Sequence, residues 1–587
     1  MPSGRHRASS PVERLLRRFR WRVSRRAAVA ALTVPVVIAG GAVLYVRGTG
    51  GACSPRDPLI VRVAAAVDIA PPVMEAADRF NATDAGVDGR CVKVQVVEQP
   101  PAPVLRTLIG DRVGVLPERP DGWITDSSVW VRLARKQGAR NLGADETVVA
   151  TSPLVFATRR SLAERFAAGK TEMSWDMVFP ATARGRLRPT ESEPDVVRVP
   201  DPSVSGAGIA TVAAARDLVG TGSEANKALT AFVRMAQAGA MPDYRTMLEA
   251  VYARGFWSRP VVIVPEQSVW AHNRGPVTEP VVALQPKEGT IHLDYPYVVT
   301  SDDPAKAKGA ELFARWLRSA PVQDLLRRAG FRSADGSQAP FEPGGEIPTR
   351  APKVLPSITP QLIDEALEAW GKLAPPSRIL VLADVSEEGA RPIGPDGQTR
   401  LGVAVKAAKL GLELFPNETH MGLWEFARGI AKGKDHRELI SVGSISEPAH
   451  GQEIRRTEML RVADSVRPLA GKSASLYDTI LAGFRSLSAG YEPMMSNALL
   501  VLTYGQDDGR GISRKELAEA LRKEWNPDRP VQIVVVMFGA GRDRAALEEA
   551  AAITNGEVYV ARQPGEIIDV FLSAIARRLC HPTCPRQ

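Results

Sequence analysis

The chain has 587 residues, of which 44% are hydrophobic and 24% charged, which excludes a wholly disordered protein and allows several globular domains. Its net charge is +9 at pH 7, but residues 1–26 alone hold nine arginines against one glutamate and leave +1 for the rest. Because the positive charge is confined to this short tail, we expect no nucleic-acid partner.

An uncharged stretch, residues 27–46, follows the arginine-rich tail. At about 1.5 Å per residue, a helix of this length spans the roughly 30 Å of a hydrocarbon core. Arginines crowd its N-terminal side and only Arg47 follows it, which predicts a cytoplasmic tail and an extracellular remainder. A cleaved signal peptide is the alternative, but the apolar run is long and no clear cleavage site follows. We therefore expect a cell-membrane protein with a single transmembrane helix.

Four cysteines fit the oxidising compartment that this topology implies. Three pairings are possible, and we favour the two local ones, Cys53–Cys91 and Cys580–Cys584, because each pair lies close in sequence. The second pair belongs to a short C-terminal tail, residues 580–587. Together with His581 it also resembles a metal cluster, but three ligands at a chain end make a poor zinc site.

Strand and helix patterns alternate through residues 58–338. The apolar run 59–69 predicts a strand, 71–82 an amphipathic helix, and the same sequence of patterns recurs over 91–110 and 122–138. Such alternation indicates an α/β layered fold.

The order of these elements resembles a type II periplasmic, or extracellular, solute-binding protein. The resemblance rests on the opening strand and on four later stretches: WITDSSVW (123–130), PDPSVSGAGIATVAAARDL (200–218), VVIVPEQSVW (261–270) and the closing segment 293–319. It covers nearly all of residues 58–338 but contains no single decisive motif. It implies a two-lobed domain that binds a small-molecule solute.

Polar residues next to predicted strand ends and helix starts are the candidates for the solute cleft. Backbone N–H groups and hydroxyls at a helix start can hold an anion, although the same residues also serve as ordinary helix caps. Ligand clefts of open α/β sheets lie at the carboxyl ends of the strands. The candidates are Asp126, Ser127, Ser128, Ser203, Ser205, Gly206, Glu266 and Gln267.

Residues 339–374 join the two large exported segments. The first part, 339–360, contains six prolines and no sustained apolar period. We expect this Pro/Gly-rich stretch to be a semi-rigid linker.

Residues 375–579 alternate near-continuous Val/Ile/Leu strands with amphipathic helices, which predicts a mainly parallel, doubly wound, Rossmann-like sheet. This segment resembles a von Willebrand factor A domain over its full length. The resemblance is carried by RILVLADVS (378–386), GLWEFA (422–427), LYDTILAGF (476–484), LLVLTYG (499–505) and ITNGEVYVA (553–561). With the anchor and the first domain, the chain is similar to a family of actinobacterial surface proteins.

The resemblance implies a divalent-metal site above the sheet, built from Asp-x-Ser-x-Ser, a threonine and a later aspartate. Asp384 and Ser386 match the first two ligands, while Glu388 stands at the third. Ala474 stands at the threonine position and Tyr504 at the later aspartate, and neither is a good ligand for a hard cation. We therefore expect a degenerate site without a cofactor, leaving at most weak binding of magnesium or calcium.

Enzyme signatures do not emerge from the sequence. Residues 167–171 and 469–473 resemble the end of a phosphate-binding loop, but the required first glycine is replaced by Glu164 and Val466. We expect a non-enzymatic binding and adhesion protein whose C-terminal domain contacts a protein partner. The alternative is the substrate-binding component of an ABC-type transporter.

Overall fold

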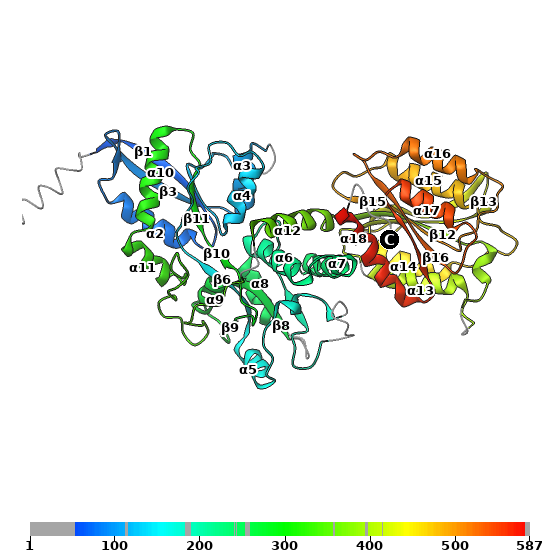
Figure 1. The fold of residues 1–587 in the computed structure, drawn as a ribbon, viewed down its shortest axis with the longest axis horizontal. Coiled ribbons are helices and arrows are strands. Elements are labelled where there is room, and N and C mark those ends of the chain that lie inside the picture. Colours follow the sequence, from blue (N-terminus) through cyan, green and yellow to red (C-terminus); the bar gives the residue numbers. More distant parts are fainter. Residues whose placement is uncertain are drawn as a thin grey trace, which may run out of the picture.

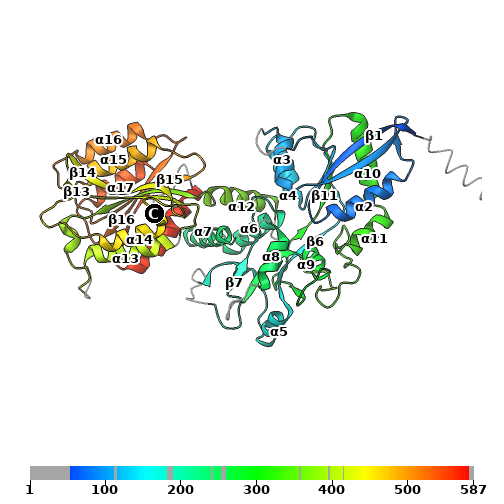
Figure 2. The same cartoon turned by 180° about the vertical axis from the view of Figure 1, so that it is seen from behind.

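The computed structural model describes residues 53–580, apart from 112–115, 182–188, 240, 242, 253–258, 356–358, 394–396 and 414. The predicted cytoplasmic tail, the transmembrane segment 27–46 and Cys584 lie outside these residues. Among the described residues, no helix is long and apolar enough to cross a membrane. The described chain forms two bodies placed end to end, as Figures 1 and 2 show. The mixed α/β class predicted from the sequence is confirmed.

The first lobe of the N-terminal body is built on a six-stranded sheet with the order β2-β3-β1-β4-β11-β5. Strand β1 pairs in parallel with β3 and β4, and β11 returns antiparallel from far along the chain. The strands are β1 Ser54–Ala65, β2 Gly86–Val87, β3 Arg90–Glu98, β4 Gly122–Ile124, β5 Thr147–Val148 and β11 Pro296–Val299. Its helices are α2 Ala70–Asn81, α3 Pro101–Ile109, α4 Ser128–Lys136, α10 Pro304–Leu317 and α11 Ala320–Arg328.

The second lobe contains a smaller sheet with the order β10-β6-β8-β7, with β9 also paired to β6. Its strands are β6 Ser152–Arg159, β7 Val196–Arg198, β8 Pro260–Pro265, β9 Val281–Leu284 and β10 His292–Leu293. Its helices are α5 Arg160–Ala168, α6 Gly206–Val219, α7 Ser223–Ala238, α8 Tyr244–Glu249 and α9 Glu266–Asn273. The chain thus leaves the first lobe after β5 and comes back to it with β11.

One of the two predicted disulfides lies within the described residues. Cys53 and Cys91 are bonded, which confirms that pairing and ties the start of β1 to β3 across 38 residues of sequence. The bond fixes the N-terminal end of the described chain to its first sheet. The pairing of Cys580 with Cys584 stays a prediction.

Part of the predicted linker is a helix rather than a spacer. Helix α12, Pro360–Leu373, is capped by the Thr359 hydroxyl and packs against α6 and α7 of the second lobe. Its buried residues Ala366, Ala369 and Leu373 join the core of the N-terminal body. The Pro/Gly-rich character is confined to the residues before the helix: five of the six prolines precede it, and the sixth, Pro360, is its first residue.

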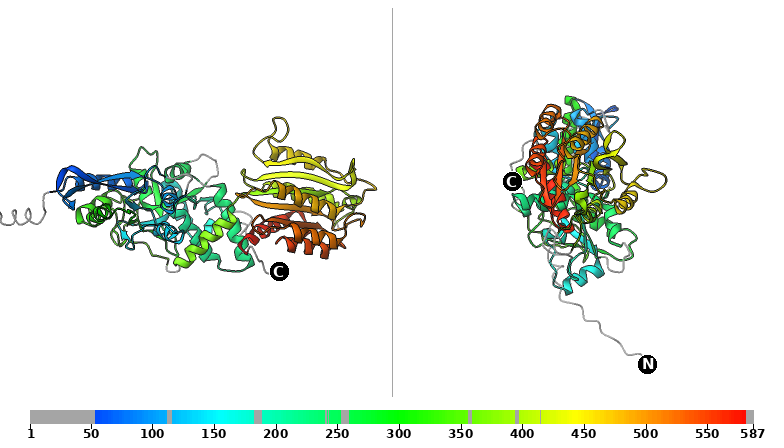
Figure 3. Two further views of the ribbon diagram at one scale, coloured as in Figure 1. Left: turned by 90° about the horizontal axis from the view of Figure 1, so that it is seen from above. Right: turned by 90° about the vertical axis from the view of Figure 1, so that its right-hand side faces the viewer.

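The C-terminal body is a six-stranded sheet with the order β14-β13-β12-β15-β16-β17, covered by helices on both faces (Figure 3). All neighbours pair in parallel except the edge pair β13–β14. The strands are β12 Ser377–Asp384, β13 His420–Ala431, β14 Lys434–Ser444, β15 Ser496–Thr503, β16 Val531–Phe538 and β17 Glu557–Ala561. The helices are α13 Arg400–Glu413, α14 Arg455–Ser465, α15 Leu476–Ala489, α16 Arg514–Glu524, α17 Arg544–Ile553 and α18 Ile567–Ala576.

Alternation along β12 explains why this sheet needs two layers of helices. Ile379 and Val381 face the core under α13, α14 and α18, whereas Leu380 and Leu382 face the core under α15, α16 and α17. Both faces of a parallel strand are therefore apolar, as the near-continuous Val/Ile/Leu pattern predicts. Helix α18 also packs against α7, so the two bodies share a helical interface.

Candidate functional site

The first candidate site lies where the two lobes of the N-terminal body meet. Asp126 follows β4 of the first lobe and is buried, and its Oδ2 accepts a hydrogen bond from the backbone N–H of Gly206 at 2.8 Å. Gly206 starts α6 of the second lobe. A Cβ at this glycine would lie 2.8 Å from Asp126 Oδ1, so only glycine allows this approach. The free helix start predicted to hold an anion is therefore occupied by the protein's own carboxylate.

The serines of the predicted site serve the backbone and each other. Ser205 caps α6 by accepting from Gly208 N, and its Oγ lies 2.8 Å from the Tyr244 hydroxyl. Ser127 caps α4 by accepting a hydrogen bond from the N–H of Val129.

The remaining serines of the predicted set contact residues outside this group. The N–H of Ser128 donates to Asp294 Oδ1 at 2.8 Å. Ser203 stands apart, with its N–H and hydroxyl both bound to Asp201 Oδ1. The structure thus brings together Asp126, Ser205 and Gly206 but not Ser203.

Three further residues belong to this site but not to the set predicted for the solute cleft. Asp68 lies between β1 and α2, and its Oδ2 accepts a hydrogen bond from the hydroxyl of Tyr295, a residue with a positive φ of 29°. Tyr244 reaches the group from α8. The only available signal was the position of Asp68 at the carboxyl end of β1, next to the end of β4 in the sheet.

Burial sets the charge of the two carboxyl groups. It raises the pKa of Asp126 to about 7, with a further rise from the negative charge of Asp68. It raises the pKa of Asp68 to about 6, opposed in part by the Tyr295 hydroxyl. At pH 7 Asp68 is therefore mostly ionised and Asp126 partly so, and this negative charge makes the site a poor receptor for an anion.

These shifts predict a pH-dependent stability of the N-terminal body. The unfolded aspartate ionises near pH 4, whereas folded Asp126 keeps its proton to about pH 7, so stability falls as the pH rises through this window. Asp126→Asn should flatten the fall in melting temperature between pH 5 and pH 8. Thermal unfolding of the full chain measures this, and Asp145→Asn, at an exposed position, should leave the fall unchanged. An equally steep fall in both variants would contradict the assignment.

Glu266 and Gln267, predicted to reach a ligand from the second lobe, are used inside the fold. The Glu266 carboxylate binds the Arg332 guanidinium through two hydrogen bonds of 2.7 and 2.9 Å, and both side chains are almost completely buried. The backbone N–H of Gln267 donates to Ser152 Oγ, and its Nε2 donates to the carbonyl of Ala329. The side chains of these residues therefore bind inside the fold rather than extending toward a solute as predicted. They connect α9 to the end of α11 and to the segment that follows it.

The second candidate site is the carboxyl edge of the C-terminal sheet. Asp384 is buried at the end of β12, with Oδ1 accepting from Ser386 N at 3.0 Å and Oδ2 accepting from Thr503 Oγ1 at 2.9 Å. Burial raises the pKa of Asp384. The Tyr504 hydroxyl donates to the main-chain oxygen of Asp384 at 3.0 Å. The first metal position is thus closed by the protein's own groups.

The other ligand positions do not complete a metal site. Glu388 lies in a 3₁₀ turn, Glu387–Ala390, and its carboxylate pairs with Arg391 at 2.8 Å and Arg400 at 3.3 Å. Ala474 is buried and has no donor atom to offer. Among the described residues, no group of three or more His, Cys, Asp or Glu side chains is arranged to hold a metal ion. The residues present do not fit the metal that the fold resemblance implies.

Removing the Tyr504 hydroxyl tests how the closed position is held. Tyr504→Phe leaves the Asp384 carbonyl without this donor and should lower the free energy of unfolding by about 1 kcal/mol. Urea unfolding measures the loss. Tyr491→Phe, a partly buried tyrosine beside Arg529, is the matched control and should change stability little.

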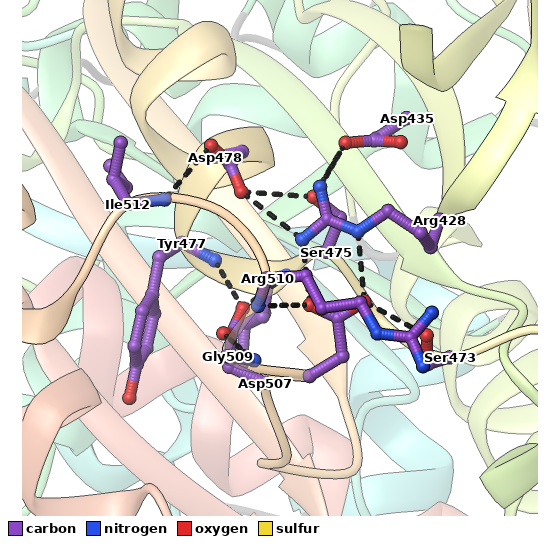
Figure 4. Close-up of polar contacts among 12 residues, drawn as sticks. Arg428, Asp435, Ser473, Ser475, Tyr477, Asp478, Asp507, Gly509, Arg510 and Ile512 are labelled. Atoms are coloured by element: carbon purple, nitrogen blue, oxygen red, sulfur yellow. Dashed lines mark hydrogen bonds and ion pairs between the residues drawn. The ribbon is translucent and has the colours of Figure 1, made fainter.

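At this edge a guanidinium group is surrounded by carboxylates, as a bound metal cation would be (Figure 4). Arg428, in β13, donates from Nε and Nη2 to the two oxygens of Asp508 at 2.8 and 2.6 Å. It also pairs with Asp435 at 2.5 Å and Asp478 at 3.4 Å. Its bonds hold the pKa of Asp508 well below the usual range, and the carboxylates raise the pKa of Arg428.

Serines complete this cluster around Arg428. Ser473 Oγ donates to Asp508 at 2.8 Å, and Ser475 Oγ lies 2.9 Å from Asp435 Oδ2. The hydroxyls flanking Ala474 therefore bind carboxylates of the cluster. Asp507 points the other way and accepts from Leu476 N and Tyr477 N at the start of α15.

Comparisons with known proteins match both bodies. Residues 61–332 match the family model of bacterial extracellular solute-binding proteins. Over 581 residues the chain is 26% identical to an uncharacterized protein of Mycobacterium tuberculosis, found in strains H37Rv and CDC 1551, with 93% of this chain and 82% of that protein covered. The N-terminal body is therefore solute-binding-protein-like.

Several solved structures are similar to part of this chain. The sulfate-binding protein SubI from Mycobacterium tuberculosis H37Rv is 21% identical, with 47% of this chain and 87% of that chain covered and a TM-score of 0.32. A periplasmic thiamin binding protein is 12% identical, covering 54% and 96%, with a TM-score of 0.39. A von Willebrand factor type A protein from Catenulispora acidiphila is 14% identical, covering 35% and 43%, with a TM-score of 0.27.

Proposed function

We propose that the chain is a non-enzymatic cell-surface binding and adhesion protein. In this proposal residues 27–46 anchor it in the cell membrane, residues 1–26 are cytoplasmic, and both described bodies lie outside the cell. The C-terminal body acts as a von Willebrand factor A domain that contacts its protein partner without a metal ion, and the protein needs no cofactor. The single observation that carries this is the Arg428 guanidinium among Asp435, Asp478 and Asp508 at the carboxyl edge of the sheet.

The physical reason is charge compensation. A metal-dependent recognition edge gathers carboxylates around a divalent cation, and the cation completes its coordination with a partner's carboxylate. Here an arginine supplies the positive charge permanently, and its bidentate contact with Asp508 fixes the loop after β15. The edge is therefore preorganised without a metal, and partner recognition falls to the exposed loop surface around it.

Lysine labelling on intact cells tests the topology and the adhesion together. A membrane-impermeant amine-reactive crosslinker should reach the exported lysines of the full chain and capture the same partner with or without a chelator. Arg510→Glu changes an exposed side chain at the recognition edge and should reduce that capture, whereas Arg485→Glu, on the side of α15 and paired with Glu524, should not. Absence of labelling on intact cells, or capture that the chelator abolishes, would refute the proposal.

The family match of residues 61–332 favours a second candidate function, the solute-binding component of a transporter. A solute entering at the start of α6 would have to displace the Asp126 carboxylate from Gly206 N. Sulfate, the tetrahedral oxyanion that suits a helix start, is a direct probe. A rise in melting temperature with sulfate, lost in Ser205→Ala, would support transport. No rise in the wild type would indicate that the Asp126 carboxylate keeps the start of α6 closed to sulfate.

A further inference from the structure

The C-terminal body contains a cavity of about 160 Å³ between its sheet and the helices α13, α14 and α18. Small side chains create it: α13 turns Ala404, Ala407, Ala408 and Gly411 toward the sheet, one helical turn apart. The walls are otherwise large apolar residues of the strands and of α18. An apolar cavity of this size stays dry and accepts apolar ligands in other proteins.

The cavity follows the length of the sheet. Along β12 the residues that line it are Ser377, Ile379, Val381 and Ala383, with Asp384 at the end. Successive strand residues rise by about 3.3 Å, so the lined stretch is about 20 Å long. A medium-length alkyl chain matches the volume and the elongated lining of this cavity, whereas a sixteen-carbon chain exceeds the volume.

One end of the cavity is lined by two polar side chains that are not fully paired with other polar or charged groups of the described residues. Gln532 of β16 lines it with only 8% of its surface exposed, and no hydrogen bond reaches its side chain from the described residues. Arg578, just after α18, lines the same end and donates to the carbonyl of Pro375 and to Ser377 Oγ. No described carboxylate pairs with Arg578, and the nearby charge that acts on it is the positive charge of Arg234.

The opposite end of the cavity is lined by an acidic residue instead of a basic one. Asp384 and Tyr504 lie there, with the tyrosine hydroxyl already bound to the Asp384 carbonyl. An acidic headgroup is thus repelled from this end and attracted to Arg578. A surface groove between α13 and α14 shares Leu401, Val405 and Lys409 with the cavity and provides a route of entry.

We infer that this cavity is a binding site for a single medium-chain carboxylate such as octanoate, with the carboxylate on Arg578 and Gln532 and the chain running from there along β12. A planar guanidinium binds a carboxylate through two parallel hydrogen bonds, and the carboxamide of Gln532 supplies a third donor. Binding would neutralise the unpaired charge next to the interface between α7 and α18. This inference does not depend on the proposed adhesion role.

Photocrosslinking on the full chain, held in phosphatidylcholine nanodiscs, tests the site. The probe is an octanoate analogue with a diazirine in its chain and a free carboxylate. Peptide mapping should place the crosslinks in residues 400–413, 496–503 and 567–576. Unlabelled octanoate should compete, whereas octanol, which lacks the carboxylate, should compete about tenfold less well.

Two variants separate the chain site from the headgroup site. Ala407→Phe fills the cavity and should abolish the crosslinks, while Arg578→Gln should reduce them about tenfold. Lys515→Gln, on the exposed face of α16, should leave them unchanged. Near-wild-type circular dichroism of each variant shows that the fold is retained.

The remaining outcomes overturn the inference. Crosslinks that map elsewhere, persist in Ala407→Phe or ignore Arg578→Gln refute the site. Displacement by phosphatidylglycerol as strong as by octanoate refutes the single-chain carboxylate and points to a two-chain anionic lipid.

Discussion

Arg428→Ala should destabilise the C-terminal body by about 2 kcal/mol, because it leaves three carboxylates facing each other without their cation. The value lies below that of a fully buried ion pair because 23% of the Arg428 side chain is exposed. Thermal unfolding followed by circular dichroism measures the loss. Arg437→Ala is the matched control: this arginine pairs with Glu425 on the neighbouring strand, is 56% exposed, and should change stability by less than about 1 kcal/mol.

Below neutral pH, the stability of Arg428→Ala should change in the opposite direction to the contribution that Asp508 makes in the wild type. In the wild type the pKa of Asp508 lies well below that of an unfolded aspartate, so its contribution to stability is full above about pH 4 and is lost as the pH falls further. Without the guanidinium, mutual repulsion raises the pKa of the three carboxyl groups. Protonation then relieves the repulsion, and the melting temperature of Arg428→Ala should rise more steeply than that of the wild type as the pH falls from 7 to 5.

Magnesium provides the second readout of the Arg428 variant. The vacated place among Asp435, Asp478 and Asp508 offers oxygen ligands, so millimolar Mg²⁺ should raise the melting temperature of Arg428→Ala but not of the wild type. A variant as stable as Arg437→Ala, with no response to magnesium, would show that Arg428 does not replace a cation.

The loss of the metal ligands was predictable from the sequence, because each unusual residue falls at a position that holds a metal ligand in the family the segment resembles. Glu388, Ala474 and Tyr504 occupy these ligand positions. In the structure Glu388 pairs with Arg391, the Tyr504 hydroxyl donates to the Asp384 carbonyl, and Ala474 is buried. Arg428 was not predictable, because its partner Asp508 lies 80 residues later in the chain. Only the pairing of strands in space brings the two together.

The interlobe site shows a different limit of the sequence. Asp126, Ser205 and Gly206 were identified as neighbours of a helix start, and the structure places them in contact. A sequence pattern cannot tell whether a helix start is left free for a ligand or filled by the protein, because Asp126 and Gly206 are 80 residues apart. The same holds for Glu266, whose partner Arg332 lies in a later segment of the chain.

Glu266→Ala should be the most damaging single substitution proposed for the N-terminal body, with a loss of about 3–5 kcal/mol. It leaves the Arg332 guanidinium, whose side chain is fully buried, without its carboxylate. The remaining described acceptor of that guanidinium is the carbonyl of Pro348 at 2.6 Å, which cannot neutralise the charge. Thermal unfolding and limited proteolysis near residues 331–348 should both report the loss.

The double variant Glu266→Leu/Arg332→Met decides whether this loss comes from the unpaired charge or from the pair itself. Replacing both partners by apolar groups removes the uncompensated charge, so the double variant should recover most of the stability lost in Glu266→Ala. Recovery would mean that the pair contributes mainly by specifying how α9 meets the segment after α11. A double variant as unstable as the single one would instead show that the two hydrogen bonds between these side chains are themselves the main stabilising contact, since the charge would no longer be at issue.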